Sequence, residues 1–257
     1  MATTVTAIGN ILGSINVPTS TSAYSAEEEE TQNEQGSATV CPACKGSGMI
    51  TRRDENGYTV SAPCRICNAL HKKYVRLLLE KAELPYHTMD VRPHDETFDF
   101  IKNFDATKPH WIVYSGKAGS GKTTESAWLA YQLICKKHVR TSFLSTDEVI
   151  RKLLATRNRL AEHEELIESL KDVDLIVLDD FLKGMPARTS YRFAEYMEAC
   201  FSLVWTRYDV RKPLVLTTQV PLRMLPQIDA ALAGRIFEMS KGHMVQYGED
   251  ARNWRTR

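Results

Sequence analysis

The first 44 residues of this 257-residue chain contain no lysine or arginine. They therefore lack the positively charged start of a secretory signal. No apolar run in the chain approaches the ~18 residues that a membrane-spanning helix needs. These absences argue against a membrane partner and predict a cytoplasmic protein.

A strong positive charge is missing as well. The net charge is +1, and the first 44 residues carry five glutamates, at 27–30 and 34, so the rest of the chain has a net charge of +6. This excess is too small for a protein that coats nucleic acid, so any DNA contact must come from local patches. Residues 1–38 are poor in aromatics and rich in Ser, Thr, Glu and Gln, which predicts a disordered tail.

From about residue 109, short apolar runs alternate with amphipathic stretches. Strands are predicted at HWIVYS, TSFLST, DLIVLDD, PLVLTT and HMVQYG, and helices near 121–137, 147–155, 160–171 and 188–206. Apolar strands separated by helices are typical of a parallel sheet covered on both faces. Residues 109–257 are thus predicted to form an α/β domain. A helix stopped by Pro85 and a short helix before residue 108 predict a helical linker over 71–108.

A phosphate-binding loop follows the first of these strands. The pattern Gly116-x-x-x-x-Gly121-Lys122-Thr123 is a Walker A loop, in which backbone N–H groups and a helix N-terminus bind phosphates. Lys122 is expected to reach the β- and γ-phosphates of ATP, and Thr123 to help hold Mg²⁺. The predicted nucleotide-binding residues are Gly116, Lys117, Ala118, Gly119, Ser120, Gly121, Lys122, Thr123 and Thr124.

Acidic and polar residues end two later strands. DLIVLDD ends in Asp179, predicted to contact Mg²⁺, and Asp180, which could orient or deprotonate the attacking water. PLVLTTQ ends in Thr218 and Gln219, which are candidates to sense the γ-phosphate through water, because parallel strands end at the same edge of a sheet. The chain is therefore predicted to be an ATPase.

Together these motifs resemble a known group. Residues from about 85 to 257 resemble the AAA+ ATPases of the DnaC/DnaI helicase-loader and IstB group. LIVLDDFLKG resembles the Walker B segment of that group, and PLVLTTQV its sensor 1 strand, with Gln219 where asparagine is commoner. The resemblance implies a P-loop AAA+ fold with a parallel sheet between helices.

The resemblance extends to two arginines. Ala233-Gly234-Arg235-Ile236 is similar to box VII, which implies that Arg235 acts as a finger on the ATP of a neighbouring subunit and that the chain self-assembles. MVQYGEDARNWRTR is similar to the closing segment of the group, which implies a γ-phosphate or subunit contact for Arg252. No helical lid fits after residue 248, so an AAA+ domain without a C-terminal lid is expected.

Two cysteine pairs stand before this domain. Cys41-x-x-Cys44 and Cys64-x-x-Cys67 are separated by 19 residues, a spacing typical of a four-thiolate zinc site. Disulfides would be reduced in the cytosol, and no βαβ pattern supports a redox pair. Residues 39–70 are therefore predicted to form a small Cys₄ zinc-ribbon-like domain, with a hairpin that turns at Asn56-Gly57.

This layout resembles DnaI-type loaders. The resemblance implies that the zinc domain engages a hexameric replicative helicase and that the assembly contacts single-stranded DNA. The implied function is an ATP-dependent helicase loader that delivers or remodels that helicase on DNA during replication initiation. An IstB-like transposition ATPase and an ATP-gated adaptor that does not hydrolyse ATP are the alternatives. The basic residues considered for phosphate contact, or as a plain solvated face, are Arg151, Lys152, Arg157 and Arg159.

Overall fold

The computed structural model of the chain describes residues 45, 49–53, 59–85, 91–248 and 251. The chain divides into two compact units, Met1–Tyr74 and Val75–Arg257. Among the described helices, none is both long and apolar enough to cross a membrane. The predicted tail over 1–38 lies outside the described residues.

The first unit contains an antiparallel hairpin. Strand β1 (Met49–Arg53) pairs with β2 (Thr59–Pro63), and Met49 lies opposite Pro63. This pairing confirms the hairpin expected between the cysteine pairs, whereas its predicted turn at Asn56 and Gly57 lies outside the described residues. Helix α2 (Arg65–Ala82) begins directly after Cys64 and ends before Pro85, as a proline disfavours helix in the residue before it.

The second unit is built on a parallel sheet of five strands. The strand order is β4-β5-β6-β3-β7, and every neighbouring pair is parallel. All five strands predicted from the sequence are present in this sheet. Their bounds are β3 (Trp111–Ser115), β4 (Thr141–Ser145), β5 (Leu175–Phe181), β6 (Leu214–Thr218) and β7 (Met244–Gln246).

The helices of this unit confirm the predicted alternation. The four long helices expected after residue 109 lie within a few residues of their predicted ends, and shorter ones complete the unit. Their bounds are α3 (Asp95–Asn103), α4 (Lys122–Lys137), α5 (Thr146–Thr156), α6 (Leu160–Asp172), α7 (Arg192–Asp209), η1 (Leu222–Met224), α8 (Leu225–Ile228) and α9 (Ala230–Met239).

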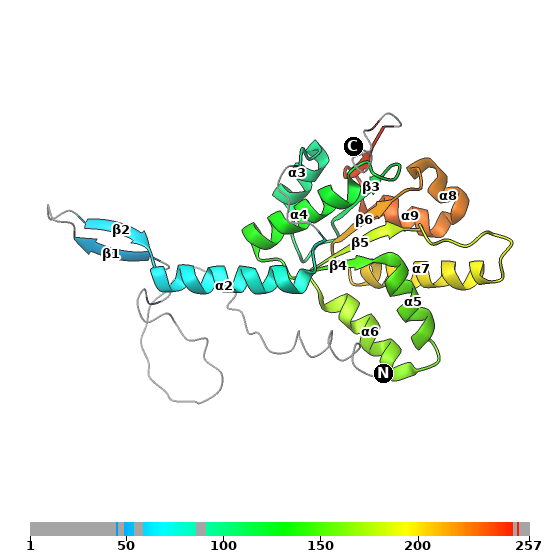
Figure 1. The fold of residues 1–257 in the computed structure, drawn as a ribbon, viewed down its shortest axis with the longest axis horizontal. Helices are drawn as coiled ribbons and strands as arrows, with labels where there is room; N and C mark the ends of the chain where they lie inside the picture. The colour runs from blue at the N-terminus through cyan, green and yellow to red at the C-terminus, as the bar shows by residue number, and fades with distance from the viewer. Residues whose placement is uncertain (1–44, 46–48, 54–58, 86–90, 249–250, 252–257) are drawn as a thin grey trace. The chain divides into compact units, whose positions relative to one another are not determined.

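Apolar side chains cover both faces of the sheet. Successive residues of a strand point to opposite faces, so alternate residues of β3, β5 and β6 serve each layer. One set packs with α5, α6, α7 and α9 in a single core cluster, and α4 lies on the opposite face (Figure 1). The strand residues of that cluster are Trp111, Val113, Ile176, Leu178, Leu214 and Leu216.

Helix α3 belongs to the second unit, although the sequence places it in the linker. Its Phe98 ring lies 5.7 Å from the ring of Trp128 on α4, and its Phe100 is fully buried. The segment before β3 therefore contributes to the same core as the predicted α/β domain.

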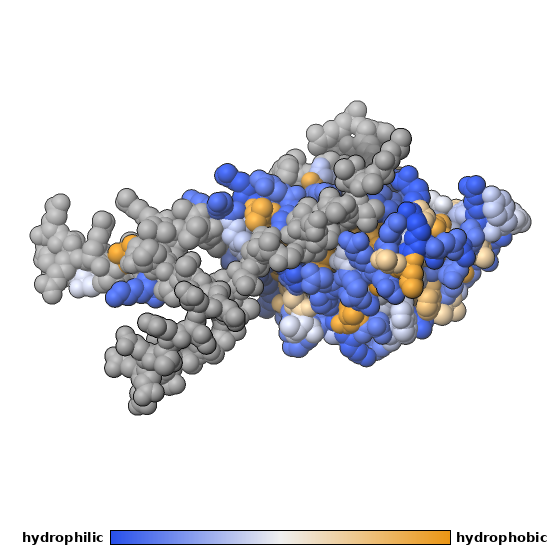
Figure 2. Space-filling model, turned by 90° about the horizontal axis from the view of Figure 1, so that it is seen from below, coloured by the Kyte–Doolittle hydropathy of each residue, from blue (hydrophilic) through white to orange (hydrophobic). Residues whose placement is uncertain are grey.

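The surface of the chain is largely polar where it is seen in Figure 2, with hydrophobic residues scattered among hydrophilic ones. Among the described residues, the exposed large hydrophobic side chains belong to separate segments rather than to one element. They are Phe98, Leu160, Tyr191, Trp205, Met224 and Met244.

A buried arginine ties together the loops at the amino-terminal edge of the sheet. Arg207 of α7 is fully buried, and its guanidinium donates to carbonyl oxygens of Leu170, Val173, Asp174 and Pro213 at 2.8 to 3.1 Å. Burial lowers the pKa of Arg207 to about 10, so the group stays charged at neutral pH. One side chain thus satisfies carbonyls from the segments that lead into β5 and β6.

We expect Arg207→Lys to destabilise the second unit, because a compact ammonium group cannot reach carbonyls that the planar guanidinium spans. Each buried carbonyl left without a donor costs about 1–3 kcal/mol, so a loss of about 3 kcal/mol and a fall in Tm of about 6–12 °C are expected. Thermal unfolding measures the change. Arg211→Lys, at an exposed arginine beyond the same helix, is the control and leaves Tm unchanged. Equal Tm values for both variants would contradict this role.

Candidate functional site

The predicted phosphate loop connects the buried strand β3 to helix α4. Gly121 caps the helix with a φ of 104°, a left-handed conformation that favours glycine. At Gly116, a Cβ atom would lie 2.7 Å from the Cβ of Tyr247, so a larger residue does not fit there. The loop therefore has the strand–loop–helix context that a Walker A sequence requires.

Lys122 is the first residue of α4 and is only 5% exposed. Its Nζ donates to the carbonyl oxygens of Gly116 at 2.8 Å and of Lys117 at 2.9 Å. The ammonium group thus lies inside the curve of the loop, where backbone N–H groups and the positive end of the helix dipole favour an anion.

Asp179 lies beside the start of α4, at the carboxyl-terminal edge of the sheet. Thr123 Oγ1 donates to its Oδ1 at 2.9 Å, and Thr217 Oγ1 donates to the same oxygen at 2.6 Å. Carboxylate and hydroxyl oxygens are the ligands that Mg²⁺ prefers. These residues fit a magnesium ion that Thr123 and Asp179 would hold together with the phosphates of ATP.

A β-bulge separates the two carboxylates of the Walker B segment. The register between β5 and β6 shifts between Leu178 and Phe181, and Asp180 has a φ of 56°. A bulge turns a side chain away from the regular alternation of the strand. Asp180 consequently has other neighbours than Asp179: its Oδ2 lies 2.7 Å from Lys183 Nζ, and Gln219 Nε2 approaches its Oδ1 at 3.4 Å.

The two threonines at the end of β6 have different neighbours. Thr218, the predicted γ-phosphate sensor, is 1% exposed, and its hydroxyl donates to the carbonyl oxygen of Phe181 at 2.8 Å. It is Thr217 that reaches Asp179, although no motif in the sequence marks this residue. The TTQ pattern signals a polar strand end, but the pleat of the strand decides which hydroxyl faces the loop.

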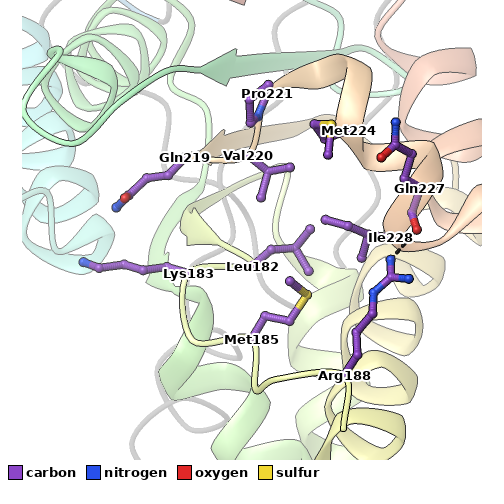
Figure 3. Close-up of a pocket in the computed structure, with 10 residues that line it drawn as sticks. All are labelled: Leu182, Lys183, Met185, Arg188, Gln219, Val220, Pro221, Met224, Gln227 and Ile228. Carbon is purple, nitrogen blue, oxygen red and sulfur yellow. Dashed lines mark hydrogen bonds between the residues drawn. The ribbon is translucent and has the colours of Figure 1, made fainter.

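An open groove of about 620 Å³ begins beside Asp180. Figure 3 shows Lys183 and Gln219 at one end of it and Arg188 at the other, where Arg188 donates to the carbonyl oxygen of Gln227. Its floor is apolar. The apolar residues that line it are Leu182, Met185, Val220, Pro221, Met224 and Ile228.

The structure does not bring Arg235 to the phosphate loop of its own chain. Its guanidinium lies over three rings of α7, at 4.8 Å from the centroids of Phe201 and Trp205 and 5.6 Å from that of Tyr208. Its Nη1 donates to the carbonyl oxygen of Ala231 at 2.9 Å. These contacts stack the arginine on a partly exposed aromatic surface.

Several predicted site residues lie outside the described part of the chain. Arg252, Cys41 and Cys44 are among them, and the side chain of Cys67 is not described. Cys64 is buried directly after β2. Among the described residues, no cluster of three or more His, Cys, Asp or Glu side chains could hold a metal ion. The zinc site and the role of Arg252 therefore stay predictions.

The chain matches no family model. It is 24% identical over 226 residues to the phage-like element PBSX protein XkdC of Bacillus subtilis (strain 168), which covers 80% of this chain and 81% of that protein. The chain is similar to a helicase loader. Among solved structures, the DnaC helicase loader is 20% identical to this chain with a TM-score of 0.47. The match covers 69% of this chain and 99% of the loader. For DnaI the values are 18% and 0.46, with 70% of this chain and 93% of DnaI covered.

We expect Lys122→Ala to weaken binding of Mg²⁺ and ATP by about 100-fold, since charge-assisted contacts of about 1.5–3 kcal/mol each are lost. Calorimetric titration with ATP measures the dissociation constant. Lys136→Ala removes an exposed lysine near the other end of the same helix and is the matched control. Unchanged affinity in Lys122→Ala would mean that the phosphate site is misassigned.

Proposed function

We propose that this chain is an ATP-dependent helicase loader, which delivers or remodels a hexameric replicative helicase on DNA during replication initiation. The contact of Thr123 with Asp179 at 2.9 Å is the observation that carries the ATP site, because it joins the two Walker segments at one edge of the sheet. The Walker A, Walker B and sensor 1 segments, which resemble those of the DnaC/DnaI group, end at this edge, which supports the loader function.

We propose that the site hydrolyses ATP. Lys122 exchanges its loop carbonyls for the β- and γ-phosphates, and Thr123 and Asp179 hold the metal. Bound Mg²⁺ offsets the negative charge of the phosphates. Asp180 lies one residue further on, where it orients or deprotonates the attacking water. Lys183 and Gln219 fix the direction of its carboxylate, and Gln219 is the proposed sensor of the γ-phosphate.

Arg235 is the proposed finger for the ATP of a second copy of the chain. The contacts that it makes lie on α7 and α9 of its own chain, which suits a group that acts in trans. Aromatic faces hold a guanidinium by about 0.5–1 kcal/mol each at exposed sites, weakly enough for the arginine to be released on assembly. Full activity would then require self-assembly.

The front of the chain is the proposed contact with the helicase. The β1–β2 hairpin between the cysteine pairs supports a zinc ribbon, in which Cys41, Cys44, Cys64 and Cys67 bind one Zn²⁺. We propose the division into a zinc domain over 39–70, a helical linker over 71–108 and an ATPase domain over 109–257, with α3 of the linker packed on the ATPase domain.

Single-stranded DNA is the other proposed partner. Three of the basic residues considered for phosphate contact form surface ion pairs, Lys152 with Glu148, Arg157 with Glu195 and Arg159 with Glu162. Exposed ion pairs stabilise a fold by about 0–1 kcal/mol, so replacing the glutamate partner with a DNA phosphate would cost little free energy.

A loading assay tests the proposed function. The replicative helicase from the same genome is supplied with circular single-stranded DNA, which a closed ring cannot thread, and unwinding of an annealed oligonucleotide is measured. We expect unwinding to require this chain and ATP. Asp180→Asn should still bind ATP but lower the rate of hydrolysis by about 100-fold, the low end of the range for general base catalysis. Asp209→Asn, at an exposed acid of α7, is the control.

Each other result of this assay contradicts part of the proposal. Unwinding without the chain means that it is not a loader. Stimulation of a transposase instead of the helicase supports the IstB-like alternative. Loading with equal, near-zero hydrolysis by the wild type and Asp180→Asn identifies an ATP-gated adaptor.

The zinc domain predicts a metal content of about one Zn²⁺ per chain. Cys41→Ser and Cys67→Ser should each remove most of it, because a closed four-thiolate site needs every ligand and supplies folding free energy through the metal. Elemental analysis of the purified protein measures zinc. Cys135→Ser, on α4, keeps the metal and is the control. A wild-type protein without zinc would refute this site.

A further inference from the structure

A buried glutamate lies directly behind the phosphate loop. Glu125 is in the first turn of α4 and only 2% exposed, and it and Lys122 are the buried charged residues of that helix. A buried carboxylate is costly unless hydrogen bonds satisfy it. The other buried residues of α4 are apolar apart from Ser126; they are Ala127, Leu129, Ala130, Leu133 and Ile134.

Donors from two distant segments satisfy this carboxylate. His94 donates from its backbone N and its Nδ1, each at 2.8 Å, and Thr97 Oγ1 donates at 2.6 Å. The Tyr247 hydroxyl donates to Oε2 from the segment after β7. Four hydrogen bonds thus join the start of α3, the start of α4 and the segment after β7.

The tyrosines around this carboxylate have fixed donor roles. Thr97 has one hydroxyl proton and gives it to Glu125, so the Tyr114 hydroxyl, at 2.8 Å, must donate to Thr97. Burial, and then the charge of Glu125, raise the pKa of Tyr114 and of Tyr247 well above the ordinary value of tyrosine. Both phenols therefore keep their protons at neutral pH. The His94 ring also contacts the edge of the Tyr247 ring, with centroids 4.9 Å apart.

Tyr247 also packs against the phosphate loop. Its backbone N donates to the carbonyl oxygen of Ser115 at 2.8 Å, and its Cβ is the atom that leaves no room for a side chain at Gly116. In the sheet, β7 lies on one side of β3, and β6 and β5, which lead to Gln219 and Asp179, lie on the other. Tyr247 and the metal-binding carboxylate thus flank the loop from opposite sides.

We infer that Glu125 is a positioning residue for nucleotide binding. Together with His94, Thr97 and Tyr247 it forms a set of contacts that we name the Glu125 latch. The latch holds Tyr247 against Gly116 and keeps the loop in the conformation that receives phosphates. This inference rests on the proposed ATP site. Since Asp179 and Asp180 lie on the other side of the loop, the latch acts on the affinity for nucleotide and not on the chemical step.

Two mild variants test the latch. Tyr247→Phe removes one donor and keeps the ring against Gly116, and Thr97→Val removes a hydroxyl without changing the shape of the side chain. A loosened latch lowers the fraction of binding-competent loop and so the apparent affinity. We expect the Kd for Mg²⁺ and the non-hydrolysable analogue AMPPCP to rise by about fivefold or more in each. KM for ATP should rise similarly, with kcat unchanged within about twofold.

Three further variants separate the latch from general stability. Thr97→Ser restores the hydroxyl and should restore the affinity. Thr156→Val removes another buried threonine hydroxyl, which lies 3.1 Å from His163 Nδ1. This hydrogen bond involves none of the latch residues, so this variant should leave the Kd unchanged. The double variant Thr97→Val/Tyr247→Phe should weaken binding by less than the product of the single effects, because both residues bind the same carboxylate.

Lys122→Ala distinguishes failure of the latch from failure of the ATP site. If Lys122→Ala loses binding while Thr97→Val and Tyr247→Phe bind AMPPCP like the wild type, the latch is refuted and the ATP site stands. If both latch variants only lower Tm, Glu125 is structural and the inference is likewise refuted. If Lys122→Ala binds normally, the ATP site itself fails, and the latch fails with it.

Discussion

The central constraint on this protein is that a parallel sheet must be covered on both faces. Strand β3 is buried along its whole length, with α4 against one face and the cluster of α5, α6, α7 and α9 against the other. Parallel strands need a crossover between each pair, and here the crossovers supply the covering helices. Every strand of this sheet then ends at the same edge, so the parallel topology alone brings the phosphate loop, Asp179 and Thr217 together.

The two edges of the sheet use polar groups differently. At the amino-terminal edge, the two terminal nitrogens of Arg207 donate to backbone carbonyls and hold the loops together. At the carboxyl-terminal edge, Thr123 and Thr217 both donate to one oxygen of Asp179. The direction of that carboxylate is therefore set by the protein, which is the preorganisation that a metal and phosphate site requires.

Neighbouring carboxylates differ in their surroundings. The bulge in β5 gives Asp179 the hydroxyls of the loop side and Asp180 the ammonium group of Lys183. Glu125, on the far side of the loop, is enclosed by donors and faces no solvent. Acidic side chains close to one phosphate loop thus differ in exposure and in partners, which supports metal binding, water activation and positioning as distinct tasks.

Much of the architecture follows from local patterns in the sequence. Short runs of strand length, separated by amphipathic stretches, predicted all five parallel strands. The signal is clearest for β3, β5 and β6, which are largely buried and begin with an unbroken apolar run. Gly116, Gly121 and Lys122 were predictable because their spacing is fixed by local backbone geometry. The hairpin β1–β2 was likewise predictable from the short segment between the cysteine pairs.

Which polar groups meet depends on the packing of the folded chain. Thr217 rather than Thr218 faces Asp179, since the pleat of β6 and the bulge in β5 set the direction of each side chain. Arg235 rests on the rings of α7, and Glu125 binds residues 31 positions before it and 122 positions after it. Contacts over such separations depend on the packing of whole elements, and no local pattern of residues records them.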